Sequence, residues 1–269
     1  MPFRKFGISF LILGYIFQSI NKEAYSQEKV IDIGEELKYE VSYGFIKLGY
    51  IKMILTSTRK EGKRTIKNAK FEVKTYPEVP FIKLNDIYET EMDYSEKEMY
   101  SRKFYETNFR DKSITRTDYK FNYSKDYIDA QIETDGRTEK KDKISIKDNL
   151  KFRDEVCWIY EARMNSFINK NFNIPVFVKE EESSVRYSFN VNSTVINIEK
   201  FNYDISAIKL EGTSDFTGFF GFKGEFLILL SDDEYRVPLK AYFNSSLGNV
   251  VWELISYKKS KWSPPAFQK

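Results

Sequence analysis

Apolar and polar residues alternate from position 224 to position 257, and this pattern limits the possible folds more than any other stretch of the chain. Every second position is apolar in three runs: Phe226, Ile228 and Leu230; then Tyr235, Val237, Leu239, Ala241 and Phe243; then Val250, Trp252 and Leu254. A period of two is typical of β-strands that bury one face. The links at 231–234 and 244–248 contain Ser, Asp and Asn, which hydrogen-bond the backbone of turns. The stretch therefore predicts a three-stranded antiparallel meander.

The same alternation predicts strands through most of the remaining chain. The expected segments are 37–43, 50–56, 65–75, 86–93, 99–110, 114–123, 127–134, 143–147, 174–179, 184–191, 195–201 and 204–211. Asp135-Gly136 is the clearest hairpin turn, and the short links elsewhere require antiparallel neighbours. Pro77 and Pro80 predict a loop over 77–84. No linker divides the chain, so residues 27–269 are expected to form a single domain.

One stretch has helical spacing instead. From 149 to 168 the apolar residues Phe152, Val156, Ile159, Tyr160, Met164 and Phe167 recur at three- and four-residue intervals. Asp148 is the expected N-cap of an amphipathic helix of about five turns. A sheet of this many strands must curl, close or split. The predicted fold is therefore all-β and mostly antiparallel, a curved or incompletely closed β-barrel with one packed amphipathic helix.

The first 26 residues have the features of a secretory signal peptide. Arg4 and Lys5 precede an apolar run over 6–17, and Ala24-Tyr25-Ser26 places small residues for cleavage before Gln27. An uncleaved anchor is the alternative, although the run is shorter than the roughly 20 residues that span a bilayer. We expect an exported protein, periplasmic or associated with the outer membrane, with no transmembrane helix in the mature chain.

Missing residue types restrict the chemistry. The chain has no His and a single Cys, Cys157, which argues against triads that use His, metal sites built from His or thiolates, and an internal disulfide. No phosphate-binding or dinucleotide-binding glycine motif is present, so we expect no cofactor and no metal. Removing the leader takes away Arg4, Lys5, Lys22 and Glu23 and lowers the net charge from +3 to +1, which argues against nucleic acid as a partner.

Three motifs carry a resemblance to a known family. The mature chain begins with Gly34-Glu35-x-Leu37-x-Tyr39-x-Val41-x-Tyr43-Gly44 and a following Gly49; the helix carries Asp154, Cys157, Tyr160 and Arg163; and the C-terminal block is Gly221-x-Lys223-Gly224, Ser231-Asp232-Asp233, Arg236-x-Pro238 and Leu247-Gly248. This pattern resembles the bacterial family catalogued as domain of unknown function 3108, over essentially the whole mature chain. The resemblance implies an exported protein of the Bacteroidetes type of envelope, without an established activity. Cys157 stands where the family usually has Ser, which argues against a catalytic hydroxyl at that position.

Six residues are candidates for ligand binding: Trp158, Tyr160 and Arg163 on the helix, and Phe219, Phe220 and Phe222 in the loop 217–222. The loop could line a pocket, contact a membrane or partner, or fold back over the core, and the last is favoured because exposed aromatic patches are costly unless used. For Asp154 and Arg163 a structural ion pair or a surface role is favoured over ligand binding, and for Cys157 a buried position. Asp232 and Asp233 are expected in a plain turn rather than in a calcium site.

The leading functional hypothesis is a non-enzymatic envelope protein that binds a lipid or another apolar or amphipathic ligand between helix and sheet. The alternative is a structural or assembly module that contacts another envelope protein through a sheet edge or the Phe loop. A glycan hydrolase that uses two carboxylates comes third. A cavity of about 300–1,000 Å³ would favour the first hypothesis.

Overall fold

A computed structural model of the chain describes residues 29–80, 82–95, 98–245 and 248–268. The predicted leader, residues 1–26, lies outside them. The strands are β1 (Glu36–Tyr43), β2 (Ile46–Glu61), β3 (Arg64–Thr75), β4 (Asn85–Ser95), β5 (Glu98–Arg110), β6 (Ser113–Asn122), β7 (Tyr127–Thr134), β8 (Arg137–Ser145), β9 (Asn171–Val178), β10 (Glu181–Ile196), β11 (Ile205–Ser214), β12 (Phe222–Ser231), β13 (Pro238–Ser245) and β14 (Gly248–Lys258). A helix, α2 (Cys157–Asn165), and a 3₁₀ turn, η1 (Phe219–Gly221), accompany them.

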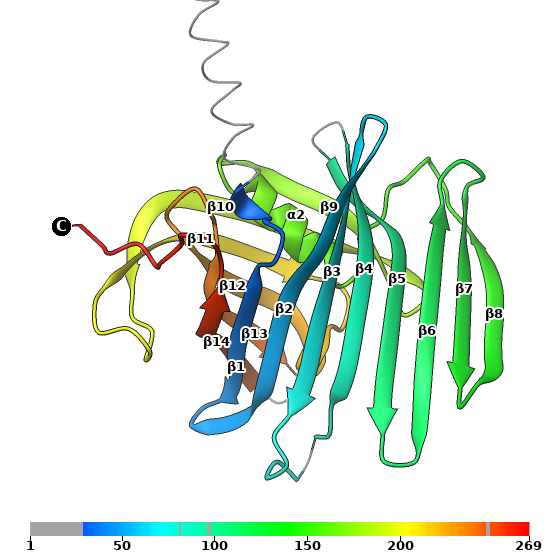
Figure 1. The fold of residues 1–269 in the computed structure, drawn as a ribbon, viewed down its shortest axis with the longest axis horizontal. Helices are drawn as coiled ribbons and strands as arrows, with labels where there is room; N and C mark the ends of the chain where they lie inside the picture. The colour runs from blue at the N-terminus through cyan, green and yellow to red at the C-terminus, as the bar shows by residue number, and fades with distance from the viewer. Residues whose placement is uncertain (1–28, 81, 96–97, 246–247, 269) are drawn as a thin grey trace, which may run out of the picture.

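The strands form one antiparallel sheet in the order β8-β7-β6-β5-β4-β3-β2-β1-β14-β13-β12-β11-β10-β9. Each strand pairs with its sequence neighbour within β1–β8 and within β9–β14. The first strand and the last join these two halves into one surface. The sheet curls around α2, and its two edge strands, β8 and β9, do not pair with each other (Figure 1). The predicted all-β, incompletely closed barrel is confirmed.

Features at both edges of the sheet discourage pairing with a strand from another chain. Strand β8 is exposed along almost its whole length and carries Lys140, Lys141 and Lys143, and charged side chains discourage pairing with another strand. The free side of β9 is covered around Val176 by Arg153, whose N–H donates to the Pro175 carbonyl at 3.1 Å and whose carbonyl accepts from Phe177 N–H at 2.8 Å. A sheet edge is therefore a poor docking site for another protein.

Most strand predictions are confirmed, with small differences. Segment 127–134 matches β7, and the Asp135-Gly136 turn has φ of 52° and 77°, as its hairpin type requires. The predicted strand 184–191 lies within a longer strand, β10, which continues to Ile196 because a register irregularity between Asn190 and Thr194 lets the ladder with β11 continue. The predicted strand 195–201 is wrong beyond Ile196, because residues 197–201 form a loop and a turn. The second strand of the meander begins at Pro238, because Tyr235–Val237 belongs to the preceding turn.

The predicted helix over 149–168 is wrong in length and cap. Helix α2 has nine residues and begins at Cys157, because Phe152 and Arg153 are extended and hydrogen-bond to β5 and β9. The cap is not Asp148. The carboxylate of Asp154 accepts the backbone N–H groups of Val156 and Cys157, each at 2.8 Å.

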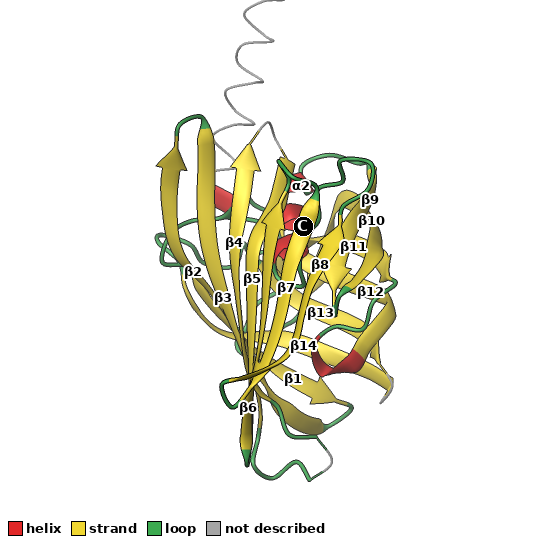
Figure 2. Cartoon of the chain, turned by 90° about the vertical axis from the view of Figure 1, so that its right-hand side faces the viewer, coloured by secondary structure: helices red, strands yellow, loops and turns green. Residues whose placement is uncertain are grey.

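Helix α2 also lacks the solvent-exposed face that the predicted amphipathic helix would have. Eight of its nine residues are buried, because the curled sheet surrounds it (Figure 2). In the described part of the chain, no helix is long and apolar enough to cross a membrane.

Gly49 is required by close packing between β2 and β3. A Cβ atom at this position would lie 2.0 Å from the Lys74 carbonyl oxygen and 2.7 Å from the Thr75 Cα atom. These are backbone atoms of the neighbouring strand, so the sheet itself would have to shift.

We expect Gly49→Ala to lower the free energy of unfolding by about 1–3 kcal/mol, the usual cost of overpacking. Urea denaturation would measure the loss. The control Lys63→Ala, in the exposed β2–β3 hairpin, should change stability by about 0.5 kcal/mol or less. Equal effects of the two substitutions would contradict the close approach of the strands.

Candidate functional site

Arg163 on α2 is the centre of a buried charged cluster with Glu35 and Lys259, which we call the Arg163 cluster. Two guanidinium nitrogens donate to the Glu35 carboxylate at 2.7 and 2.9 Å, and the Lys259 ammonium donates to it at 2.6 Å. The three side chains are at most 1% exposed. Arg163 also donates to the carbonyls of Val30 at 2.6 Å and Arg236 at 3.1 Å. These partners use most of its donors, so the cluster fastens α2 to the start of β1 and the end of β14, which are neighbours in the sheet.

The titration of Glu35 reflects two opposing influences. Burial alone would raise the pKa of its carboxyl, but the charges and hydrogen bonds of Arg163 and Lys259 outweigh it and lower the pKa. Burial also lowers the pKa of Lys259, despite the nearby Glu35 charge. Glu35 therefore stays ionised inside the protein, where an unpaired carboxylate would be costly.

Asp154 and Cys157 belong to a second buried network. Ser101 Oγ donates to the Asp154 carboxylate at 2.7 Å, and Thr90 Oγ1 donates to the same oxygen. Cys157 is fully buried, as expected, and burial raises the pKa of its thiol well above the ordinary value. A protonated, inaccessible thiol is a poor nucleophile.

A further buried ion pair, Arg153 with Glu161, escaped the sequence reasoning. Arg153 donates to both Glu161 oxygens, at 2.7 and 2.5 Å, and reaches Glu98 at 3.1 Å. Arg153 and Glu161 lie eight residues apart on a segment that is only partly helical, and no spacing rule marks such a pair.

The Phe loop folds back over the core, as the favoured hypothesis predicted. Phe219, Phe220 and Phe222 are each 3% exposed. The ring centroids of Phe219 and Tyr88 lie 4.6 Å apart, and those of Phe222 and Phe243 also lie 4.6 Å apart. The loop is thus part of the packed interior and does not offer an aromatic surface to a partner.

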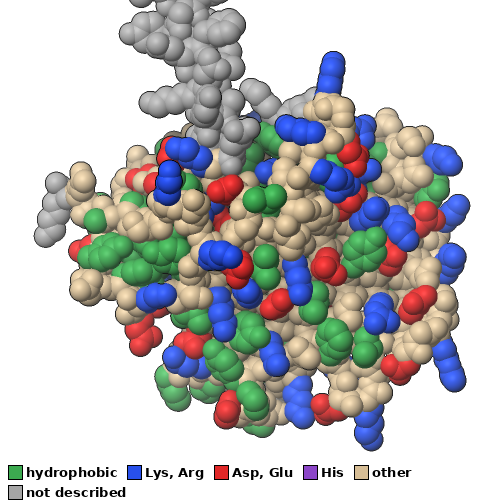
Figure 3. Space-filling model, viewed as in Figure 1, with side chains coloured by type: hydrophobic (Ala, Val, Ile, Leu, Met, Phe, Trp, Pro, Cys, Tyr) green, Lys and Arg blue, Asp and Glu red, His purple; other side chains and the backbone are tan. Residues whose placement is uncertain are grey.

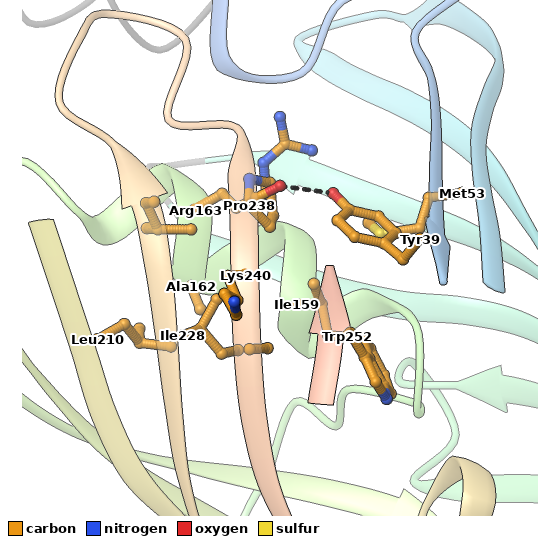
Figure 4. Close-up of a pocket in the computed structure, with 12 residues that line it drawn as sticks. Tyr39, Met53, Ile159, Ala162, Arg163, Leu210, Ile228, Pro238, Lys240 and Trp252 are labelled. Atoms are coloured by element: carbon orange, nitrogen blue, oxygen red, sulfur yellow. Dashed lines mark hydrogen bonds between the residues drawn. The ribbon is translucent and has the colours of Figure 1, made fainter. Parts of the chain in front are cut away.

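The cavity beside α2 is small. It has a volume of about 20 Å³, which is room for roughly one water molecule. It is lined by Tyr39, Met53, Ile159, Ala162, Arg163, Leu210, Ile228, Leu230, Pro238, Lys240, Ala241 and Trp252, and the Tyr39 hydroxyl donates across it to the Pro238 carbonyl (Figure 4).

Of the six predicted site residues, only Arg163 belongs to this lining. Trp158 and Tyr160 are fully buried on α2. The structure brings the helix and the Phe loop into one aromatic core, in which Tyr160 and Phe219 both contact Phe71, at 6.1 and 5.7 Å between ring centroids.

Glu155 is a buried carboxyl that has acidic neighbours inside the barrel. Burial, followed by the charge of Glu106, raises the pKa of Glu155 to about 8, and Asp86 adds to the effect. Asp86 is paired with Arg110 at 2.5 Å. Within the described residues, no group of three or more acidic or Cys side chains could hold a metal ion.

Among the described residues, the most exposed large apolar side chain is at the tip of the β1–β2 hairpin, which the sequence pattern did not mark as a site. Phe45 is 96% exposed, and Tyr43 and Ile46 are 40% and 39% exposed on either side of the turn. We call these three residues the β1–β2 tip. Hydrophobic side chains reach the surface at the lower left of Figure 3, around the ends of these strands.

Replacing Arg163 with Met should lower the free energy of unfolding by about 3–5 kcal/mol, because Glu35 would lose its main partner inside the protein. The matched control is Arg186→Met, which breaks an exposed pair with Asp215 that is 52% and 41% exposed. Exposed pairs are worth about 0–1 kcal/mol. Chemical denaturation of both variants would measure the difference, and similar losses would show that the Arg163 cluster does not fasten the helix.

Glu155→Gln should stabilise the protein at high pH. Between pH 4.5 and about 8 the folded state holds a proton on Glu155 that the unfolded state has released. Stability therefore falls as pH rises through this window and stays low above it. We expect the variant to be more stable at pH 8 by on the order of a few kcal/mol, and the gain to vanish near pH 4.5. Thermal unfolding against pH, with exposed Glu225→Gln as control, measures this; a constant offset would contradict the assignment.

Solved structures include chains that are similar over most of this chain's length at low sequence identity. One similar structure is a beta-barrel-like protein with domain of unknown function DUF1849 from Brucella abortus, with 9% sequence identity, a TM-score of 0.48, and coverage of 86% of this chain and 99% of that one. Another is a Bacteroides fragilis protein with a YmcC-like fold, with 8% identity, a TM-score of 0.34, and coverage of 85% and 97%.

No protein of curated function matches the sequence. The family model for proteins of unknown function DUF3108 matches residues 38–255, which include the strands β2–β13 and the helix α2 with Asp154, Tyr160 and Arg163. The chain therefore belongs to the DUF3108 family.

Proposed function

We propose that this chain is an exported envelope protein that acts by binding rather than by catalysis, and that its apolar contact is with a lipid surface through the β1–β2 tip. The observation that carries the proposal is Phe45, a large aromatic side chain that is 96% exposed at a two-residue turn. The hairpin does not need Phe at this position, because turns of this kind favour small or polar residues. Export rests on the leader-like residues 1–26.

The interior is a weaker place for the ligand. A volume of about 20 Å³ beside α2 is far below the roughly 300–1,000 Å³ of ligand pockets. Binding between helix and sheet would require α2 to move, and the buried Arg163 cluster opposes that movement. We therefore place the contact with an amphipathic partner on the outside of the barrel, at the β1–β2 tip.

Shape favours a bilayer over a protein partner. The β1–β2 tip is convex and presents three apolar side chains, whereas a stable protein interface buries about 800 Å² on each partner. Insertion into the fluid boundary between headgroups and acyl chains requires no complementary pocket, and aromatic side chains are favourable there.

The charges near the tip suit anionic headgroups. Lys47 follows the tip and is 60% exposed, although it is paired with Glu40. Lys74, near the end of β3 on the same end of the sheet, is exposed. Basic residues next to an inserted apolar group strengthen binding to anionic lipid. The contact would be reversible, because one Phe contributes about 1.5–3 kcal/mol.

Phe45→Ser should weaken binding to vesicles of phosphatidylethanolamine and phosphatidylglycerol about 10- to 100-fold, in proportion to the lost apolar transfer energy. Co-sedimentation would measure binding. The control Val195→Ser, at a position 43% exposed on β10, should bind like the parent chain. Circular dichroism should show an unchanged fold for both variants.

Failure of the parent chain to bind any vesicle would contradict the lipid proposal. Capture of an envelope protein that depends on Phe45, in the absence of vesicle binding, would instead support the assembly-module alternative.

A further inference from the structure

An open groove lies over one end of strands β4–β7, separate from the barrel interior and from the β1–β2 tip. Its volume is about 510 Å³. Its lining includes Lys103 on β5, Lys120 on β6 and Asp129 on β7. Lys120 is paired with Lys103 on one side and with Asp129 on the other, so the three residues form a row across the strands. Aromatic side chains from the same end of the sheet, Tyr100 and Tyr123 among them, complete the lining.

Asp93 is the unusual member of the groove. It is completely buried, it belongs to the lining, and neither carboxylate oxygen accepts a hydrogen bond from any described residue. Its nearest charged neighbour is the Arg64 guanidinium, at 3.5 Å. A buried carboxylate normally accepts several hydrogen bonds, and leaving it without them is costly. The groove therefore contains an acceptor that a ligand with hydroxyl groups would satisfy.

The rest of the groove is basic. Five cationic residues line it, Arg64, Arg102, Lys103, Lys120 and Lys151, against the carboxylates Asp93 and Asp129. Several of these cations are neutralised by carboxylates outside the groove; Arg102, for example, pairs with Glu61 at 2.7 Å.

Lys151 is different. It lies over the rings of Tyr100 and Tyr123, at 4.8 and 4.2 Å from their centroids, and no ion pair joins it to a carboxylate in the described part of the chain. Its positive charge is held in place by aromatic rings and is available to an anion.

We propose that this groove binds an acidic saccharide, a hydroxyl-rich ligand that carries a carboxylate or a phosphate. Sugar hydroxyls donate to Asp93, the acidic group meets Lys151, and the apolar face of the sugar ring packs on Tyr100 or Tyr123. An anion without hydroxyl groups lacks donors for Asp93, and a simple cation would be repelled by the basic lining. This site does not depend on the proposed lipid contact.

Isothermal titration calorimetry of residues 27–269 with a galacturonic acid trisaccharide and with glucose phosphate tests the proposal and separates carboxylate from phosphate recognition. A neutral maltotriose and inorganic phosphate are the comparison probes. We expect one acidic sugar to bind at least about tenfold more tightly than either comparison probe.

Two variants locate the site. Asp93→Asn and Lys151→Met should each weaken binding of the acidic sugar by about tenfold or more, whereas Lys141→Met, an exposed cation on β8 outside the groove, should leave it unchanged. Asp93→Asn should not unfold the protein, because it removes a buried charge that accepts no hydrogen bond from any described residue. Thermal unfolding of the variant should therefore show a cooperative transition, as in the parent chain.

Absence of binding by both acidic sugars would overturn the proposal, as would phosphate binding as tight as that of the sugars and unaffected by Asp93→Asn. Phe45→Ser should retain sugar binding and Asp93→Asn should retain vesicle binding, so the two proposals fail separately.

Discussion

The ladder between β1 and β14 is the interaction on which the rest of the structure depends. It pairs residues 36–43 with residues 250–258 and converts two runs of sequential strands into one sheet. Glu35 immediately precedes β1 and Lys259 immediately follows β14, so the Glu36–Lys258 pair brings their side chains to one place. Arg163 meets them there. Long-range strand pairing thus builds the Arg163 cluster, and the cluster in turn holds α2 inside the curl.

Buried charges of this kind specify an arrangement more than they stabilise it. Removing charges from water costs free energy that their mutual attraction only partly returns, and a well-packed apolar group often does as well. Breaking one partner is costly, however, so α2 has a strong preference for the position in which Glu35, Lys259 and the Val30 carbonyl are all satisfied. A nine-residue helix has little stability of its own. Tertiary contacts therefore determine where it begins and ends.

That dependence explains which features the sequence predicts. Strands with one buried face leave a period-two pattern, so β7 and the Asp135-Gly136 turn are predictable from local residues. The order of the strands is not local, and neither is the segment before α2. Phe152 and Val156 have helical spacing, yet Phe152 is extended, because its carbonyl accepts a hydrogen bond from Ser101 of β5. The family motif marks Arg163 as a special residue. No local pattern marks Asp93, because its burial without a hydrogen-bond donor depends on the folded sheet.

The packed interior beside α2 is the reason that both proposed binding sites are on the outside of the molecule. The aromatic residues that suggested a ligand chamber, Trp158 and Phe219 among them, pack against one another and against the sheet. Such a core leaves little internal space, but it makes the surface rigid, and binding groups held on strands keep their geometry better than groups on loops. The groove has its charged row on three adjacent strands, and the β1–β2 tip lies at the end of two strands anchored in the same sheet. On this reasoning the interior of this DUF3108 protein provides a stable platform, and both proposed binding sites are on its outer face.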